Sequence, residues 1–308
     1  MSGASVRDRA ARFVPAAMSC MLLLMAAAQA EEAPFTESDG WRLYTPDFSK
    51  APARKSGELP LCDQDNKSGW KRLDGFWDEF DGNTLDQARW WPKNPTWAGR
   101  PPGRFEESNL TVSGGCLRLA ARPLPAPEGE WDHATAALQS RERVLYGCFE
   151  VRARVMAACV CNAFWFYDAT PELWTEIDVF EIGARAPEPV RGVHMTAHVF
   201  RMPGHSAHRQ WSQMLRPPFD PAADFHVYTL EWTPGHLRWH VDGLLVREGK
   251  NTLWHQPLTL NCDVEIMRDW FGPPRKDELP AFFEIDYVRA WTGGPADGSG
   301  ANTTPKTK

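Results

Sequence analysis

The sequence of 308 residues lacks clusters of lysine and arginine, and this absence limits the partners that the protein can bind. Its formal net charge is −6 at pH 7. A protein that binds nucleic acid or an anionic membrane surface usually presents a concentrated positive patch. We therefore expect neither a nucleic acid nor a membrane as a partner.

Long apolar runs are missing after the first 30 residues. Before that point, three arginines precede a mostly apolar segment at 16–28, and Ala28-Gln29-Ala30 has the A-x-A form of a cleavage site. The apolar segment is too short to cross a bilayer core of about 30 Å. We predict a signal peptide over residues 1–30, and hence a secreted or periplasmic protein whose net charge after cleavage is −8.

The cysteines lack the C-x-x-C spacing of a zinc or redox site. Six of them follow the predicted cleavage site: Cys62, Cys116, Cys148, Cys159, Cys161 and Cys262. An even number in a secreted chain allows up to three disulfides, with fifteen possible connectivities. Alternatively, several are small buried thiols. The sequence does not select between these readings.

Internal repeats and long helical periodicity are also absent. Short runs of alternating or apolar residues recur instead at spacings of about 8 to 12 residues, which is typical of an all-β sandwich or jelly roll. The strongest strand patterns lie at 110–112, 116–121, 149–155, 162–167, 173–183, 225–232, 236–241, 244–247 and 282–291.

The composition divides the chain after the signal peptide into three parts. Residues 31–70 are rich in proline, serine, lysine and aspartate, and we predict an irregular N-terminal arm. Residues 71–292 hold the strand patterns and form the predicted folded domain. Residues 293–308 are dominated by small and polar residues and predict a flexible tail.

The predicted strand at 173–183 (LWTEIDVFEIG) carries three acids and no base in an otherwise apolar and aromatic run. Side chains alternate between the faces of a strand, so Glu176 and Asp178 share one face. Glu181 would point to the opposite face unless one extra residue, a β-bulge, follows Asp178. With this bulge, all three carboxyl groups lie along one face of one strand.

Such an arrangement suits retaining glycoside hydrolysis, which needs two carboxyl groups about 5–5.5 Å apart, one as nucleophile and one as acid/base. Four strand steps place the Cα atoms of Glu176 and Glu181 about 13 Å apart, and two inward-leaning side chains can close that gap. Asp178 can orient the nucleophile, and crowded like charges raise the pKa of one acid. The alternative is a solvated strand face, but such faces usually mix acids with bases.

Aromatic residues favour a carbohydrate site. The chain contains fifteen tryptophans, and Trp174 and the segment Phe164-Trp165-Phe166 lie close to the acids in sequence. Aromatic faces suit stacking against sugar rings, although a single tryptophan is more often part of the core.

The segment 174–181 resembles the catalytic signature of glycoside hydrolase family 16 in its bulged E-x-D-x-x-E form. Further segments resemble the family in order along residues 71–292: 146–152 (YGCFEVR), 164–166 (FWF), 228–235 (YTLEWTPG), 241–243 (VDG) and 283–291 (FEIDYVRAW). The resemblance implies a β-jelly roll of two curved antiparallel sheets with a concave substrate groove, and endo-acting, retaining hydrolysis of a β-linked polysaccharide. It makes Glu176 the nucleophile, Asp178 its assistant and Glu181 the acid/base, with no cofactor required for the chemistry.

Three segments resemble the agarase and porphyranase branch of the family, which attacks red-algal galactans: 96–119, 194–200 and 262–272. This resemblance implies a secreted endo-β-galactanase that cleaves agarose, porphyran or a related sulfated galactan. The alternatives are an endo-β-1,3-glucanase, a transglycosylase and a non-catalytic glycan-binding jelly roll.

The resemblance also implies substrate-binding residues. Trp97 and Arg104 would lie near the negative subsites, and Trp165 and Trp174 would form an aromatic floor with His198 nearby. Glu265 and Trp270 would lie at the opposite groove wall. Guanidinium groups bind oxyanions in bidentate fashion, so Arg141, Arg185 and Arg201 are candidates for sulfate binding or are simple surface charges.

Glu79 and Asp286 resemble positions near a structural calcium ion on the convex face of family members. Carboxylate oxygens are ligands that calcium prefers. We therefore expect at most a structural Ca²⁺ at these two residues. For the whole protein we expect a monomer that acts on a polysaccharide.

Overall fold

The computed structural model describes residues 40–204 and 207–294, so the predicted signal peptide and most of the predicted tail lie outside the described residues. Regular structure in this part is almost entirely β. Five short 3-10 helices occur between strands: η3 (Phe48–Lys50), η4 (Leu61–Asp63), η5 (Asp74–Phe76), η6 (Glu107–Asn109) and η7 (Lys276–Glu278). No helix among the described residues is long and apolar enough to cross a membrane.

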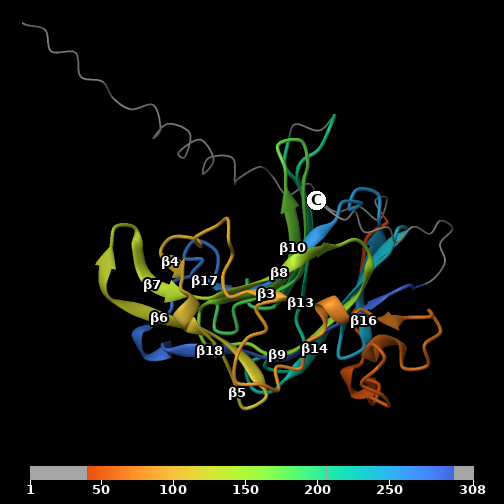
Figure 1. The fold of residues 1–308 in the computed structure, drawn as a ribbon, viewed down its shortest axis with the longest axis horizontal. Coiled ribbons are helices and arrows are strands. Elements are labelled where there is room, and N and C mark those ends of the chain that lie inside the picture. The colour runs from red at the N-terminus through yellow and green to blue at the C-terminus, as the bar shows by residue number, and fades with distance from the viewer. Residues whose placement is uncertain (1–39, 205–206, 295–308) are drawn as a thin grey trace, which may run out of the picture. The chain divides into compact units, whose positions relative to one another are not determined.

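The larger sheet has eleven strands (Figure 1). Its main order is β1 (Arg42–Leu43), β16 (Leu244–Lys250), β15 (His236–Val241), β14 (His226–Trp232), β9 (Gly147–Arg154), β18 (Ala281–Thr292), β6 (Cys116–Glu128), β7 (Trp131–Thr135) and β4 (Gly103–Phe105). Two further strands, β2 (Lys71–Arg72) and β5 (Leu110–Ser113), pair with β18 and β6. The pairing is antiparallel throughout except between β4 and β7.

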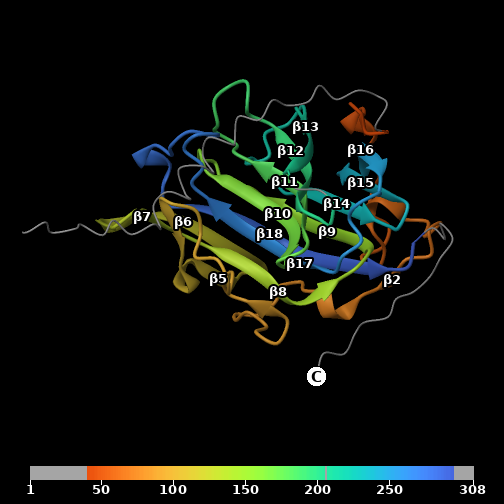
Figure 2. The same ribbon diagram turned by 90° about the horizontal axis from the view of Figure 1, so that it is seen from above.

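The smaller sheet has seven antiparallel strands, of which β10 to β13 lie side by side in Figure 2. Its order is β13 (Arg209–Leu215), β12 (Val193–Arg201), β11 (Trp174–Ile182), β10 (Cys161–Ala169), β17 (Leu258–Glu265), β8 (Ala137–Val144) and β3 (Trp90–Trp91). The strand that carries the three acids, β11, therefore lies inside this sheet.

The two sheets pack face to face around one apolar core. Phe149 on β9 and Phe166 on β10 belong to different sheets, and their ring centroids are 4.8 Å apart. Phe180 on β11 and Tyr228 on β14 also belong to different sheets, and their ring centroids are 4.4 Å apart. Large buried aromatic rings dominate the energy of such a core. One face of the seven-stranded sheet therefore packs in the core, and we call the opposite face the outer face.

The predicted all-β fold is confirmed, and each predicted strand coincides with an observed one to within a few residues. Nine strands that are shorter or have weaker patterns were not predicted, namely β1, β2, β3, β4, β7, β8, β12, β13 and β17. Along 149–155, Phe149, Val151, Ala153 and Val155 alternate with Glu150, Arg152 and Arg154, which predicts a strand with one buried face, yet Glu150 on the other face is fully buried as well. Its carboxylate accepts hydrogen bonds from Leu61 N and Tyr287 Oη, so the N-terminal arm covers this part of the sheet.

The arm is less irregular than the sequence suggested. Residues 42–43 form β1, which pairs with β16, and Trp41 is buried in the core. The six cysteines are all free thiols in this structure, and four of them are buried.

Candidate active site

The pairing of β11 contains the predicted bulge. Asp178 lies opposite Thr196 of β12, whereas Glu181 lies opposite His194, so three steps along β11 match two steps along β12. An extra residue of this kind is a β-bulge.

The bulge changes which side chains face the core. Val179 and Phe180 are adjacent, yet both belong to the core cluster, which strict alternation would not allow. Glu181 therefore returns to the outer face, where it interacts electrostatically with Asp178 and Glu176. The sequence prediction that three acids share one face of one strand is confirmed.

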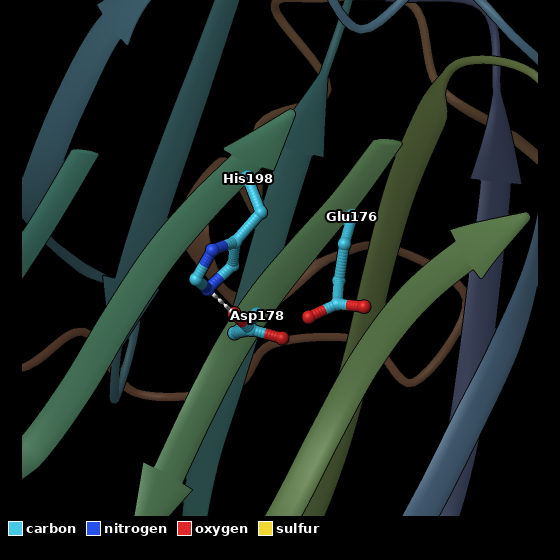
Figure 3. A group of neighbouring side chains, drawn as sticks. All are labelled: Glu176, Asp178 and His198. Atoms are coloured by element: carbon cyan, nitrogen blue, oxygen red, sulfur yellow. Dashed lines mark ion pairs between the residues drawn. The ribbon is translucent and has the colours of Figure 1, made fainter. Parts of the chain in front are cut away.

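Glu176, Asp178 and His198 form a compact cluster on β11 and β12 (Figure 3). Potential ligand atoms of the three side chains all lie within 4.8 Å of one another. His198 is the register partner of Glu176, and its Nε2 lies 3.1 Å from Oδ2 of Asp178. His198 therefore contacts Asp178, the acid that the family resemblance makes the assistant of the nucleophile.

Burial controls the protonation of the acids. It raises the pKa of Glu176 to about 8, and the neighbouring Asp178 adds to this shift. It raises the pKa of Asp178 to about 8 as well, although the Arg247 guanidinium opposes the shift. The pKa of Glu181 lies well above its usual range because of burial first and of the charges of Asp178 and Glu265 next.

Three carboxyl groups that share one buried region cannot all be ionised near neutral pH, because like charges repel and water is excluded. The cluster therefore retains protons at pH 7. A protonated acid beside an ionised one is the combination that general acid catalysis and nucleophilic attack require.

A fourth acid of the outer face, Glu265 at the end of β17, lies next to the cluster and raises the pKa of Glu176, Asp178 and Glu181. Nε of Arg100 donates to Oε2 of Glu265 at 2.7 Å. The charge of Glu265 raises the pKa of Arg100, whose side chain remains about half exposed. A cation thus lies beside the acids and still reaches solvent.

Aromatic side chains form a second apolar cluster that includes Trp165, Trp97 and Trp270. The rings of Trp97 and Trp165 are 6.5 Å apart, and Trp165 stacks on Tyr167 at 4.7 Å. Nε1 of Trp165 donates to Asp263 of β17 at 2.9 Å. The structure thus brings together three of the predicted substrate-binding tryptophans near Glu265.

Trp174 lies at the other side of the acids, at the start of β11. Its ring packs on Phe200 of β12 with centroids 4.5 Å apart. Phe200 in turn stacks on His198 at 5.1 Å. Trp174 and His198 therefore both pack against Phe200, and their role in substrate binding stays a prediction.

Two of the predicted substrate-binding arginines, Arg104 and Arg141, contact residues other than the three acids. Arg104 is paired with Glu106 at 2.7 Å and with Glu128 at 2.9 Å. The guanidinium of Arg141 lies 3.5 Å from the ring centroid of Trp91. Both side chains are thus engaged by neighbours other than the three acids.

The other two predicted arginines are also occupied. Arg185 pairs with Asp220 at 2.9 Å, and Arg201 donates to the backbone oxygen of Pro171 at 2.7 Å. Their role as sulfate ligands stays a prediction. Arg100 interacts electrostatically with Glu181 and Glu176, and it lies four residues before Arg104 in the same sequence segment.

Arg100 and Asp263 are site residues that the sequence reasoning missed. Asp263 is buried, its pKa is raised well above the usual range by burial, and its Oδ1 has no hydrogen-bond partner among the described residues. The sequence contained a pattern that indicates Asp263. Asn261, Asp263 and Glu265 alternate along β17 in the same way as Glu176 and Asp178 do along β11 before the bulge.

The expected calcium residues are engaged by arginines. Both oxygens of Glu79 accept hydrogen bonds from Arg289 at 2.9 Å, and Asp286 pairs with Arg152 at 2.9 Å. Two carboxylates already neutralised by guanidinium groups do not fit a calcium ion, which needs several free oxygen ligands. The calcium hypothesis stays an untested prediction that this geometry does not favour.

Comparison with known proteins identifies the family. Residues 70–293 match the family model for the GH16 domain of β-porphyranases A–D. The chain belongs to glycoside hydrolase family 16, a family of endo-acting O-glycosyl hydrolases, as the catalytic signature on β11 indicated.

Curated relatives have several activities. A β-porphyranase B from Phocaeicola plebeius is 32% identical over 274 residues, which cover 72% of this chain and 84% of the relative. A β-porphyranase E from Zobellia galactanivorans is 25% identical over 74% of this chain and 90% of its own length. A β-glucanase from Fibrobacter succinogenes is 30% identical over 60% of this chain, which spans only 54% of that relative.

Solved structures confirm the jelly-roll fold. Porphyranase B from Zobellia galactanivorans superimposes with a TM-score of 0.65 at 21% identity, over 79% of this chain and 99% of that chain. A β-agarase A in complex with oligoagarose gives a TM-score of 0.64 at 19% identity, over 80% of this chain and 99% of that chain.

Proposed function

We propose that the protein is a secreted, retaining endo-β-glycoside hydrolase that cleaves a red-algal galactan by double displacement. The observation that carries the proposal is the bulged strand β11, which presents three acids with raised pKa values on one face, Asp178 buried and Glu176 and Glu181 partly exposed. Two carboxyl groups in different protonation states are the machinery of this reaction.

In the first step, a carboxylate oxygen of Glu176 forms a bond to the anomeric carbon of the sugar. The glycosidic C–O bond breaks, and Glu181 gives its proton to the leaving oxygen. The strongly raised pKa of Glu181 suits a group that must hold a proton until this moment. Asp178, next to Glu176 on the same face, orients the nucleophile.

In the second step, Glu181 acts as base and takes a proton from a water molecule. The water oxygen bonds to the anomeric carbon, the ester bond to Glu176 breaks, and the sugar leaves with its original configuration. All of these transfers use side chains of the chain itself, and we propose no cofactor for them.

Three observations support a galactan as the substrate. The matching family model is that of porphyranases, and porphyranases are among the curated relatives. Trp97, Trp165 and Trp270 offer aromatic surface for sugar rings close to the acids. The half-exposed guanidinium of Arg100 suits an anionic substituent such as sulfate, because arginine binds oxyanions through two parallel hydrogen bonds.

An endo-β-1,3-glucanase is the second candidate. It is favoured by a curated relative named glucan endo-1,3-β-glucosidase A1 from Niallia circulans, which is 23% identical over 70% of this chain. The same three acids would serve its chemistry, so the two candidates differ only in the residues that recognise the sugar.

A reducing-end assay on the purified protein tests the proposal. Porphyran, agarose, carrageenans, laminarin and lichenan are digested in parallel, with Glu176→Gln as the inactive control. We expect release of reducing ends from one galactan and a loss of at least about 1,000-fold in the variant, because the nucleophile is removed. Cleavage of laminarin alone would show that the protein is a glucanase and not a galactanase. Binding to a glycan without any cleavage would support a glycan-binding role.

A further inference from the structure

His208 is a histidine that the mechanism above does not use, yet it contacts the catalytic cluster. It lies immediately before β13, and its Nε2 is 2.9 Å from Nδ1 of His198. His198 contacts Oδ2 of Asp178 through its other nitrogen, at 3.1 Å. Two histidine rings therefore connect the surface of the protein with the acid next to the nucleophile.

The two rings are held in nearly parallel planes. Phe200 covers both, with its centroid 4.3 Å from that of His208 at an interplanar angle of 6° and 5.1 Å from that of His198 at 13°. This stacking keeps the facing nitrogens in line, so the contact between the histidines is directional.

The hydrogen bonds of this chain must all run in one direction. Burial lowers the pKa of His198 below its ordinary value, so the ring is neutral at pH 7 and carries one proton. If that proton is on Nε2, it faces Oδ2 of Asp178, a buried oxygen at 3.1 Å that has no hydrogen-bond partner among the described residues, and Nδ1 accepts a hydrogen bond from His208. If it is on Nδ1, it is donated to His208, and Asp178 must place its own proton toward His198.

We propose that His208 is a positioning residue, which donates from Nε2 to His198 and thereby fixes the tautomer whose Nε2–H faces Asp178. The catalytic consequence rests on the proposed hydrolase function, whereas the tautomer of His198 does not. His208 is exposed, so its own Nδ1 accepts from water and the donor form is available.

This direction matters for the nucleophile. When His198 carries its proton on Nε2, 3.1 Å from Oδ2 of Asp178, a proton on Asp178 is favoured on the other oxygen. Figure 3 shows that oxygen turned toward the carboxyl group of Glu176. In the chain His208, His198, Asp178, a proton on Asp178 then faces Glu176 and orients its carboxyl group.

Other charged groups face the same cluster. Glu176 on the same strand and Glu265 on β17 add negative charge, whereas the buried Arg247 of β16 adds positive charge behind it. Glu181 couples to Asp178 across the bulge. These groups remain unchanged when His208 is replaced, so a change in the cluster can be assigned to the missing donor.

The first test is the ¹⁵N NMR spectrum of the histidine rings in the full chain, which needs no substrate. We expect His198 to carry its proton on Nε2 in the wild type. In His208→Phe, which keeps a ring against Phe200 but removes the donor, a large share of the proton should move to Nδ1. In His208→Gln, which retains an N–H, most of it should stay on Nε2.

The second test is kinetic and uses the polysaccharide that the protein cleaves. His208→Phe should lower kcat by about 10-fold with KM changed less than twofold, because the groups that orient the nucleophile lose their alignment while the substrate contacts remain. The acid limb of its kcat/KM profile should move to higher pH, because the ionised form of Asp178 loses a donor. His208→Gln should recover most of the rate.

His255→Phe is the matched control, since it removes a histidine that contacts Tyr146 Oη at 2.8 Å, outside the three-acid cluster. It should leave the tautomer of His198, kcat and the pH profile unchanged. An unchanged tautomer in His208→Phe would overturn the proposal even if no substrate is found. A changed tautomer with wild-type kcat would overturn the catalytic role alone.

Discussion

At the scale of single residues, Glu176 is a charge-bearing group that the fold places where charge is unfavourable. Burial raises its pKa from 4.5 to about 8. When folding raises the pKa of an acid, the folded state binds the proton more tightly than the unfolded state does. The resulting stabilisation is complete below the unfolded-state pKa, and it is lost as the pH rises through the folded-state pKa. Between about pH 4.5 and 8, ionising Glu176 therefore destabilises the folded protein.

We predict that Glu176→Gln is more stable than the wild type at pH 8. Glutamine keeps the shape and removes the buried charge, so the melting temperature should rise by about 4 to 8 °C, which corresponds to about 2 kcal/mol in a protein of this size. At pH 4.5 the difference should be small. Differential scanning calorimetry at both pH values measures this.

Glu248→Gln is the control with the opposite sign. The hydroxyl of Tyr44 and the guanidinium of Arg238 lower the pKa of Glu248, so its charge stabilises the folded state above the unfolded pKa. The variant should melt lower than the wild type at pH 8. A fall in melting temperature for both variants would contradict the assignment of Glu176 as a strained acid.

At the scale of elements, the bulge in β11 depends on support from the opposite sheet. Nε1 of Trp239 on β15 donates to the backbone oxygen of Asp178 at 2.9 Å, at the start of the bulge. Nε1 of Trp254 donates to the backbone oxygens of Glu176 and His198, both at 3.0 Å. The catalytic strand is thus held from within the core as well as by its neighbours in the sheet.

We predict that Trp239→Phe loses both stability and activity. The change leaves a buried carbonyl without its donor, which costs about 1 to 3 kcal/mol. Because the carbonyl belongs to Asp178, kcat should fall by about 10-fold or more as the acids move from their aligned positions. Urea denaturation and the reducing-end assay measure the two effects.

Trp291→Phe separates stability from catalysis. It removes an equally buried indole, whose Nε1 donates to the backbone oxygen of Glu58 at 2.7 Å in the N-terminal arm. It should lose a similar free energy of unfolding while kcat stays within twofold of the wild type. An equal loss of kcat in both variants would show that Trp239 has no special role at the bulge.

The elements also show how far the sequence predicts the site. The spacing of Glu176, Asp178 and Glu181 determines the bulge, because no other backbone places all three acids on one face. Arg100 and His208 were not predictable in this way. Both lie outside strands, where no periodicity orients a side chain, and their partners Glu265 and His198 are brought to them only by the folded sheet.

At the scale of the whole described structure, the fold class was predictable because turn residues and alternating runs mark nine of the eighteen strands. The packing of residues 40–70 against the sheet was not predictable, because a sequence without periodicity does not indicate which surface it covers. Glu150 shows the difference. Alternation assigns it to the face opposite the core, yet the arm supplies Leu61 N as a partner at 2.7 Å and buries the carboxylate completely.

The whole account depends on one claim, that Glu176 attacks the sugar and Glu181 serves as acid and then base. Proton NMR of the first reducing ends released from the cleaved polysaccharide tests this claim most directly. Double displacement predicts that the β-anomer appears first and that the α-anomer grows later by mutarotation. Initial release of the α-anomer would mean a single displacement and would contradict the role of Glu176 as nucleophile.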